Sequence, residues 1–256
     1  MPRAWTDEAV VLRTHNVGET DRFCILLTKS RGRMAVRASG VRRLTSRRGA
    51  GLLPLHRVHV TLETHSSGTT VSAAQSIDSH SAAWRDPHAF SCAERGVELL
   101  LKFIEDGDPV PDVYALTCDF LSLCCAPHAA HLTELFTLKL LTILGTCPSV
   151  RFSSISHHPF KQGDDIVFSP QPGGFALRSE ETAGVRISPE LVSLLAHLET
   201  SSLRQSVDTS AELQSELKRF AQRLLGSQLG VSLSAPDVSL ALSSGVTPTC
   251  QVRGRA

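Results

Sequence analysis

Arginine is the residue whose number and spacing in this sequence point most clearly to a chemistry. Twelve basic residues precede Glu63, and eleven of them are arginine. Four of these, Arg42, Arg43, Arg47 and Arg48, fall within seven residues. A guanidinium group donates two hydrogen bonds at once to a phosphate and is less strongly hydrated than an ammonium group. The pattern therefore favours binding of a polyanion.

The charge of the chain is divided unevenly between its two ends. Residues 1–85 hold 13 Lys and Arg against 6 Asp and Glu, a net charge of +7, and the rest hold 13 against 19, a net charge of −6. Such a split is typical of a nucleic-acid-binding end joined to an acidic body. The alternative is an uneven scatter of solvated charge, which the clustering disfavours.

Residues that could support catalysis are few. His157 and His158 with Asp164 and Asp165 are the one cluster that suggests a hydrolytic metal site, but adjacent histidines rarely point at one ion, and H-E-x-x-H is absent. A metal hydrolase remains an alternative, which predicts a bound metal. The sequence contains no P-loop, G-x-S-x-G or G-x-G-x-x-G. We expect neither an enzyme nor a cofactor.

The cysteines indicate a reducing compartment, and the hydropathy indicates a chain without a membrane span. The seven cysteines are scattered, with no C-x-x-C pair, so we expect free thiols packed as small apolar groups. No run approaches the length of a membrane span. We expect a cytoplasmic, nucleoid-associated protein without membrane contacts.

Short strands are predicted in the first third of the chain. Segments rich in Val, Leu and Thr alternate with Gly, Pro, Asn and Ser turns, and such a series fits a small barrel. The segments cover residues 8–13, 22–28, 33–41, 56–64 and 69–77. Alternation places Arg33, Arg37 and Arg57 on the outer wall, opposite Val36 and Val58.

Aromatic residues are scarce in this region. Trp5 and Phe23 are the only Phe, Tyr or Trp residues of the strand region, and alternation groups Phe23 with Ile25 and Leu27 on the inner face. We therefore expect base stacking to be a minor contribution and phosphate contacts the major one.

Beyond residue 86 the apolar period becomes helical. We expect helices at about 90–104, 112–125, 131–144 and 189–200, and a last one that begins at Thr209, where Thr209-x-x-Glu212 forms a capping box. The predicted organisation is a DNA-binding domain over 1–82, a helical domain over 83–230 that includes an irregular region at 146–186, and a flexible tail over 231–256.

Several segments together resemble the bacterial RecO family of recombination mediators. The N-terminal landmarks occur in order and with matching spacing: Val10-Val11-Leu12-Arg13, Gly18-Glu19-Thr20-Asp21, Leu26-Leu27-Thr28, Gly32, Gly40, Ser46-Arg47 and Leu53-Pro54. Two later landmarks are Leu141 to Gly145 with Pro148, and Phe168-Ser169-Pro170 with Gly173-Gly174. The resemblance is strong to about residue 65 and weak after 180.

This resemblance implies an α+β protein: an N-terminal OB-fold, which is a five-stranded β-barrel, and a mainly α-helical C-terminal domain. Family members bind single- and double-stranded DNA, anneal complementary strands, and work with RecR and the C-terminal tail of single-strand-binding protein to load recombinase on gapped DNA. The candidate DNA-binding residues are Arg33, Arg37, Arg42, Arg43, Arg47, Arg48 and Arg57.

Many relatives also carry a zinc module with two C-x-x-C pairs. The matching positions here are Ser153, Ser156, Leu177 and Glu180, so the resemblance implies a degenerate, zinc-free finger-like insertion. Such a loss leaves open an alternative: a protein-interaction adaptor of the same fold with incidental DNA affinity. Recognition of the partner's tail needs an apolar pocket beside a cation, and the candidate cations are Lys139, Arg204, Lys218, Arg219 and Arg223.

Overall fold

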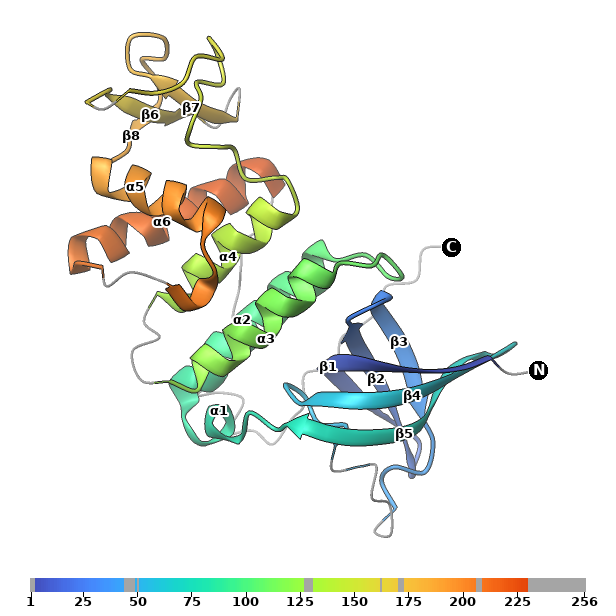
Figure 1. Ribbon diagram of the computed structural model, residues 1–256. Coiled ribbons are helices and arrows are strands. Elements are labelled where there is room, and N and C mark those ends of the chain that lie inside the picture. Colours follow the sequence, from blue (N-terminus) through green and yellow to red (C-terminus); the bar gives the residue numbers. More distant parts are fainter. Residues whose placement is uncertain are drawn as a thin grey trace.

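A computed structural model describes residues 3–43, 49, 51–126, 131–161, 163–169, 173–205 and 209–229. The chain forms a β-barrel, a group of helices beside it, and a small sheet at the far end of the helices (Figure 1). The expected tail at 231–256 lies outside the described residues.

Five strands close into the expected OB-fold barrel, in the order β1-β2-β3-β5-β4. β3 and β5 pair in parallel through Arg37 and Thr70, and the other neighbours are antiparallel. The strands are β1 (Arg3–Val17), β2 (Asp21–Thr28), β3 (Gly32–Ala38), β4 (Arg57–His65) and β5 (Gly68–Asp78). The first strand is therefore longer at both ends than its apolar run suggests.

The barrel wall has two buried faces over part of its area. Val11 and Leu26 belong to the core inside the barrel. Val10, Leu12 and Leu27 point outward and belong to the core of the helices. The helices thus cover one region of the outer wall and leave the rest to solvent.

A β-bulge in β1 decides which side chains continue along this outer wall. The pairing of β1 with β2 shifts between Val11 and Arg13. After the shift, Arg13 lies opposite Ile25, and His15 lies opposite Phe23. Both β1 residues therefore follow the outer face.

Phe23 is on the outer face, and its predicted inward position is wrong. Its exposed fraction is 39%, whereas Cys24 and Leu26 are fully buried inside the barrel. Alternation fails here because Ile25 and Leu27, on the outer face of the same strand, pack against the helical core. A strand that is apolar on both faces does not reveal which face is inside.

The helices follow the barrel along the chain. They are α1 (Ser81–Arg85), α2 (Pro87–Phe103), α3 (Pro111–Cys124), α4 (Leu132–Ile143), α5 (Pro189–Thr200), the 3-10 turn η1 (Leu203–Gln205) and α6 (Ala211–Leu229). Asp86 caps α2 by accepting a hydrogen bond from the His88 N–H at 3.0 Å. Gly96 of α2 allows α3 to pack closely, because a Cβ there would overlap the Phe120 ring.

The last helix begins at Ala211, two residues after the predicted start. The Ser210 hydroxyl accepts a hydrogen bond from the Leu213 N–H at 3.3 Å, so Ser210 is the N-cap. The Thr209 hydroxyl lies 3.4 Å from the His131 ring instead. The capping-box interpretation of Thr209 and Glu212 is therefore wrong.

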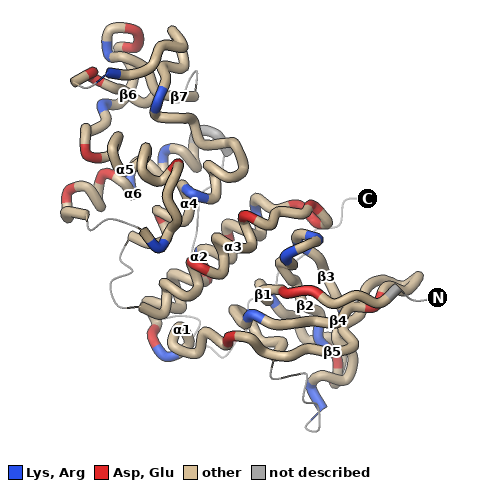
Figure 2. Tube along the Cα trace, in the orientation of Figure 1, with Lys and Arg blue, Asp and Glu red and all other residues tan. Residues whose placement is uncertain are grey.

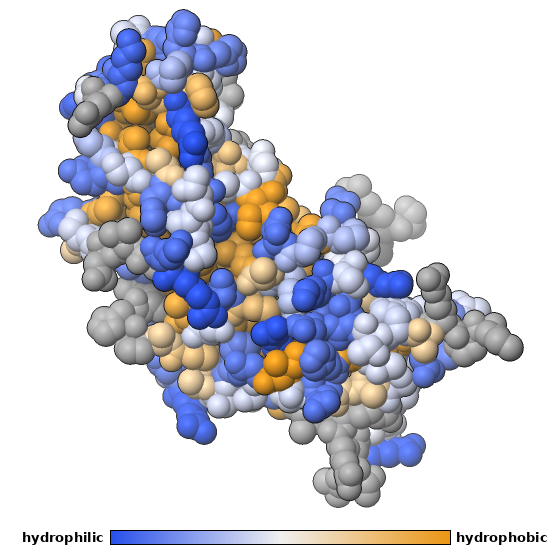
Figure 3. All heavy atoms as spheres, in the orientation of Figure 1, coloured by the Kyte–Doolittle hydropathy of each residue, from blue (hydrophilic) through white to orange (hydrophobic). Residues whose placement is uncertain are grey.

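A three-stranded sheet, in the order β7-β6-β8, packs on α6. Its strands are β6 (Ile166–Ser169), β7 (Gly174–Leu177) and β8 (Val185–Arg186). The rings of Phe168 and Phe175 lie 5.1 and 5.7 Å from that of Phe220. In the view of Figure 3, hydrophobic surface gathers over the helices and this sheet.

None of the helices in the described part of the chain combines the length and hydropathy that a membrane crossing needs. Six cysteines are within the described residues, and none of these six forms a disulfide. The sulfur atoms of Cys92 and Cys124 lie 3.5 Å apart. Cys250 lies outside the described residues.

Candidate nucleic-acid interface

Arg33 lies at the start of β3, where the barrel meets the connection between α2 and α3. Its Nε donates to Asp106 Oδ1 at 2.5 Å and its Nη1 to the Leu101 carbonyl at 2.6 Å. The Gly107 N–H donates back to the Arg33 carbonyl at 2.8 Å. Alternation correctly places Arg33 on the outer wall, but this part of the wall is covered. Its guanidinium therefore links the barrel to the helices.

Arg57, at the start of β4, is held in a similar way. Its Nη2 lies 2.6 Å from Glu8 Oε2, and the Tyr114 hydroxyl donates to the same oxygen at 3.1 Å. The Arg57 guanidinium lowers the pKa of Glu8, and the Glu8 carboxylate raises the pKa of Arg57. Burial raises the pKa of Tyr114. This triad joins β1, β4 and α3.

Arg13 completes a set that we call the inner arginines: Arg13, Arg33 and Arg57. The Arg13 guanidinium lies 3.6 Å from Glu94 of α2. Burial raises the pKa of Glu94, and Arg13 opposes this effect. Each inner arginine therefore has a carboxylate partner at the junction of barrel and helices. We do not retain Arg33 and Arg57 in the proposed DNA-binding set, because their ion-paired side chains are only 20% and 34% exposed.

The opposite end of the barrel carries Arg37. Its Nε and Nη2 donate to Asp21 Oδ2 at 3.0 and 2.7 Å, and the Gly40 N–H donates to Asp21 Oδ1 at 2.9 Å. The Gly40 hydrogen bond, followed by that of Arg37, lowers the pKa of Asp21 to about 2. The Arg37 side chain remains 55% exposed. Asp21 thus fixes one side of the guanidinium and leaves the other to solvent.

Arg42 and Arg43 follow β3 at this same end. The Arg42 N–H donates to the Thr20 carbonyl at 3.0 Å, and its Nη1 donates to the Gly18 carbonyl at 2.8 Å. The Arg43 N–H donates to the Gly40 carbonyl at 3.3 Å. Both side chains are exposed. The segment is therefore tied by its backbone to the β1–β2 turn.

We call Arg37, Arg42 and Arg43 the loop-end arginines. In Figure 2 basic residues mark the lower tip of the barrel, away from α2 and α3, and a second basic group lies where β3 meets the α2–α3 connection. In the described part of the chain, Arg42 and Arg43 have no carboxylate within ion-pair distance. Arg47 and Arg48 lie outside the described residues.

The four positions that match the family's zinc ligands come together in the irregular region. Ser153 donates to Glu180 Oε2 at 2.6 Å, and the Leu177 N–H donates to the same oxygen at 3.0 Å. The Ser156 N–H donates to the Ser153 hydroxyl at 3.2 Å. The Ser153 hydrogen bond, as the largest cause, lowers the pKa of Glu180.

This donor set does not fit a structural zinc site, which takes four Cys or His ligands, whereas one carboxylate and two hydroxyls are present. A carboxylate-centred hydrogen-bond cluster joins the two turns instead. Nowhere in the described ranges do three or more His, Cys, Asp or Glu side chains gather in a metal-binding arrangement. Asp164 accepts from the Lys161 N–H at 2.7 Å, and Asp165 pairs with Arg186 at 2.9 Å. The absence of bound zinc stays a prediction.

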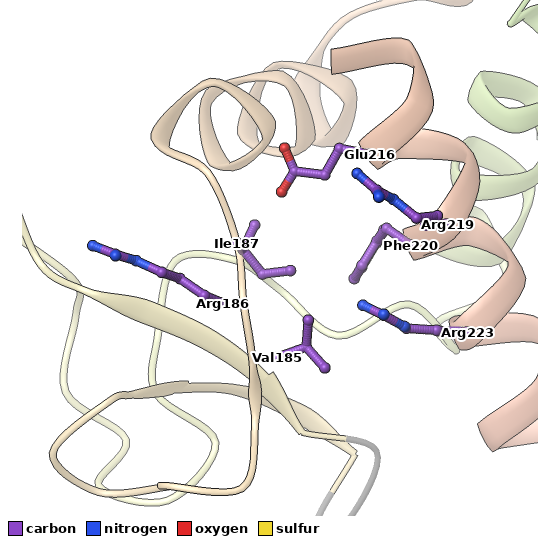
Figure 4. Close-up of a pocket in the computed structure, with 7 residues that line it drawn as sticks. All are labelled: Val185, Arg186, Ile187, Glu216, Arg219, Phe220 and Arg223. Atoms are coloured by element: carbon purple, nitrogen blue, oxygen red, sulfur yellow. The ribbon is translucent and has the colours of Figure 1, made fainter. Parts of the chain in front are cut away.

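A cavity of about 210 Å³ lies between α6 and the segment that contains β8 (Figure 4). Val185, Ile187 and Phe220 supply apolar lining, and the charged lining consists of Arg186, Glu216, Arg219 and Arg223. Arg186 pairs with Asp165, and Glu216 accepts hydrogen bonds from Ser188. Figure 4 shows Arg219 and Arg223 extending from α6 toward this segment. The cavity therefore combines an apolar lining with three exposed arginines, of which Arg186 has a carboxylate partner, and with one carboxylate that is held by Ser188.

The other three candidate cations for tail recognition are placed differently. Lys139 donates to the Leu198 carbonyl at 2.7 Å, and Arg204 pairs with Asp119 at 2.6 Å. Lys218 is exposed on α6 but does not line the cavity. Only the fold separates these residues from Arg219 and Arg223, since all five look alike in sequence.

Two family models match the chain. The model described as Recombination protein O N terminal matches residues 1–80, and that described as Recombination protein O C terminal matches residues 85–236. The chain is 31% identical to "DNA repair protein RecO" of Heliobacterium modesticaldum, over 77% of this chain and 74% of that protein. It is 28% identical to the protein of the same name from Myxococcus xanthus, over 91% of this chain and 96% of that protein.

Proposed function

This chain belongs to the Recombination protein O family of DNA repair proteins, and we propose that it binds DNA phosphates through the loop end of its barrel as a non-catalytic mediator. The observation that supports this proposal most is the exposure of Arg42 and Arg43 without carboxylate partners in the described part of the chain. Arg47 and Arg48 follow within five residues and add to the charge.

The proposed contact is made to the DNA backbone. Each guanidinium neutralises a phosphate and releases counterions, so affinity falls as salt rises. With Arg37, Arg42, Arg43, Arg47 and Arg48 engaged, the slope of log affinity against log salt should be about −3.5 for single strands. Phosphate contacts carry little sequence information, so sequence preference should be weak.

Strand annealing is the activity that we propose for this mode of binding. A surface that holds DNA by its phosphates leaves the base edges free to pair. It also lowers the repulsion between two approaching strands, because each phosphate that it contacts is neutralised. The helical part would then place the bound strands near the other proteins of recombinational repair.

We further propose that the cavity at α6 receives the C-terminal tail of single-strand-binding protein. Apolar contacts with Val185, Ile187 and Phe220 suit a hydrophobic end group, and Arg219 and Arg223 suit carboxylates. Together with RecR, such docking would direct the protein to gapped DNA, where recombinase is loaded. Arg219→Glu with Arg223→Glu should abolish capture by the tail peptide while leaving binding to naked DNA unchanged.

Annealing of complementary oligonucleotides at low salt tests the proposed function. The wild-type protein should speed pairing, and a variant with Arg42, Arg43, Arg47 and Arg48 changed to Glu should lose both DNA binding and annealing. Wild-type protein that fails to anneal, or a variant that binds normally, would contradict the proposal. Capture of RecR and single-strand-binding protein without salt-dependent DNA binding would instead identify an adaptor. Elemental analysis tests the metal-hydrolase alternative.

A further inference from the structure

An exposed aromatic ring lies on the part of the barrel wall that the helices do not cover. Phe23 of β2 lies opposite His15 of β1 and opposite Arg37 of β3, so the three residues form a row across adjacent strands. All three are exposed. Val17, two positions beyond His15 on the same side of β1, is 41% exposed. We call His15, Phe23 and Arg37 the wall row.

The wall row differs from the covered part of the same wall. One position along β2 on this face, Ile25 packs against the helical core, and Leu27 is fully buried there. Phe23 is the first outer residue of β2 beyond that cover. Its ring therefore makes no contribution to either core and presents apolar area to solvent.

The other aromatic residue of the strand region is differently placed. The Arg31 guanidinium lies 4.1 Å from the centre of the Trp5 ring, over its face. A flat ligand would have to displace this cation before it could stack on Trp5. Phe23 has no ring contact of this kind within the described residues.

Charge around Phe23 matches a nucleic acid strand. Arg37 is its direct neighbour in the row, and Asp21, two residues before Phe23, holds that guanidinium through two hydrogen bonds. The hydrogen bond from the Arg42 N–H to the Thr20 carbonyl places the remaining loop-end arginines at the same end of the barrel. An apolar ring beside several phosphate-binding groups suits a ligand that offers both a flat base and a phosphate.

We propose that Phe23 stacks on an unpaired nucleobase of a single DNA strand whose phosphates are held by the loop-end arginines. This inference rests on the proposed function, since it assigns a second contact to the same surface. Stacking requires a base face that duplex DNA does not expose. Phe23 therefore gives the barrel a preference for single strands, which phosphate contacts alone do not provide.

The test measures the affinity of Phe23→Ala and of Phe152→Ala for an oligo-dT strand and for a duplex of equal length. Phe152 is a matched control, because it is a phenylalanine with 51% exposure that lies in the irregular region and not on the barrel. We expect Phe23→Ala to weaken single-strand binding at least about five-fold and to leave duplex binding unchanged. Phe152→Ala should change neither. Thermal unfolding of each variant checks that the fold is intact.

Phe23→Trp separates stacking from mere packing. The new indole should restore single-strand affinity, and its fluorescence should be quenched by oligo-dT and not by duplex. Equal single-strand affinity of Phe23→Ala and wild type, or equal losses on strand and duplex, would overturn the inference while leaving phosphate binding in place. Wild-type protein without salt-dependent DNA binding would overturn the proposed function itself.

Discussion

At one end of the barrel, Arg13, Arg33 and Arg57 each meet a carboxylate where the strands touch the helices. At the other end, Arg42 and Arg43 extend into solvent from a segment whose backbone is tied to the β1–β2 turn. The residue type is the same at both ends. What differs is the partner, because the inner arginines meet groups supplied by α2, α3 and their connection.

This difference shows that a basic sequence region need not form one basic surface. Arg33 and Asp106 are 73 residues apart in sequence, so their pairing depends on the docking of two parts of the chain. Arg37 and Asp21 are 16 residues apart and pair inside the barrel alone. Net charge of the first third therefore overstates the charge available to DNA.

Substitution of Gly32 should give the largest difference in the free energy of unfolding between the two ends. It adopts a φ of +67°, and a Cβ there would overlap the Asp108 carbonyl of the α2–α3 connection. Gly18, at the loop end, has a φ of +59° and open space around it. Gly32→Ala should lower the free energy of unfolding by at least about 3 kcal/mol, and Gly18→Ala by about 1 kcal/mol. Urea denaturation of both variants measures this. Equal losses would show that the junction is not tightly packed.

The Arg57 triad should give the next largest effect. Arg57→Met leaves Glu8 with only the Tyr114 hydroxyl, so the free energy of unfolding should fall by about 1–2 kcal/mol. The matched change at the loop end, Arg42→Met, should stay within about 0.5 kcal/mol, because that side chain is exposed. A double-mutant cycle of Arg57→Met with Glu8→Gln should be non-additive by at least about 0.5 kcal/mol. Additive losses would mean that the pair is not coupled.

A fall in pH should change the free energy of unfolding less than these substitutions do, and it should act differently on a carboxyl group at each end. Burial raises the pKa of Glu94 at the inner end, whereas the pKa of Asp21 at the loop end is lowered to about 2. Asp21 therefore stabilises the native state above its ordinary pKa of 3.8, and this contribution is lost as the pH falls toward 2.

Ionisation of Glu94 has the opposite effect on stability. Its ionisation disfavours the native state, so its contribution is full below 4.5 and is lost as the pH rises through its higher native pKa. Carboxyl-carbon NMR titration should find that Glu94 protonates first on acidification. If Asp21 protonated before Glu94, the assigned environments would be wrong.

The sequence predicts the fold better than it predicts the surface. The five strands and the main helices follow from apolar periodicity, because burial of one face imposes the period. The same periodicity assigns Arg33 to the outer wall but says nothing of what packs on that wall. Alternation misplaces Phe23 for a related reason, since β2 is apolar on both faces where the helices cover it.

Other features depend on details that no period encodes. Ser210 caps α6 in place of Thr209, so the helix is capped one residue later than the sequence pattern predicts. Glu180 and Ser153 form a hydrogen-bond cluster at positions that match the zinc ligands of many relatives, and the missing cysteines alone do not reveal this cluster. Arg219 and Arg223 stand out from the other cations only once α6 and β8 lie together.

The salt dependence of single-strand binding tests the division between the two ends most directly. The measurement compares wild type, Arg42→Gln with Arg43→Gln, and Arg57→Met. The slope of log affinity against log salt should become shallower by about 1.4 in the loop-end double variant, since two phosphate contacts are removed, and should not change in Arg57→Met. An unchanged slope in the double variant, or an equal change in Arg57→Met, would contradict the account.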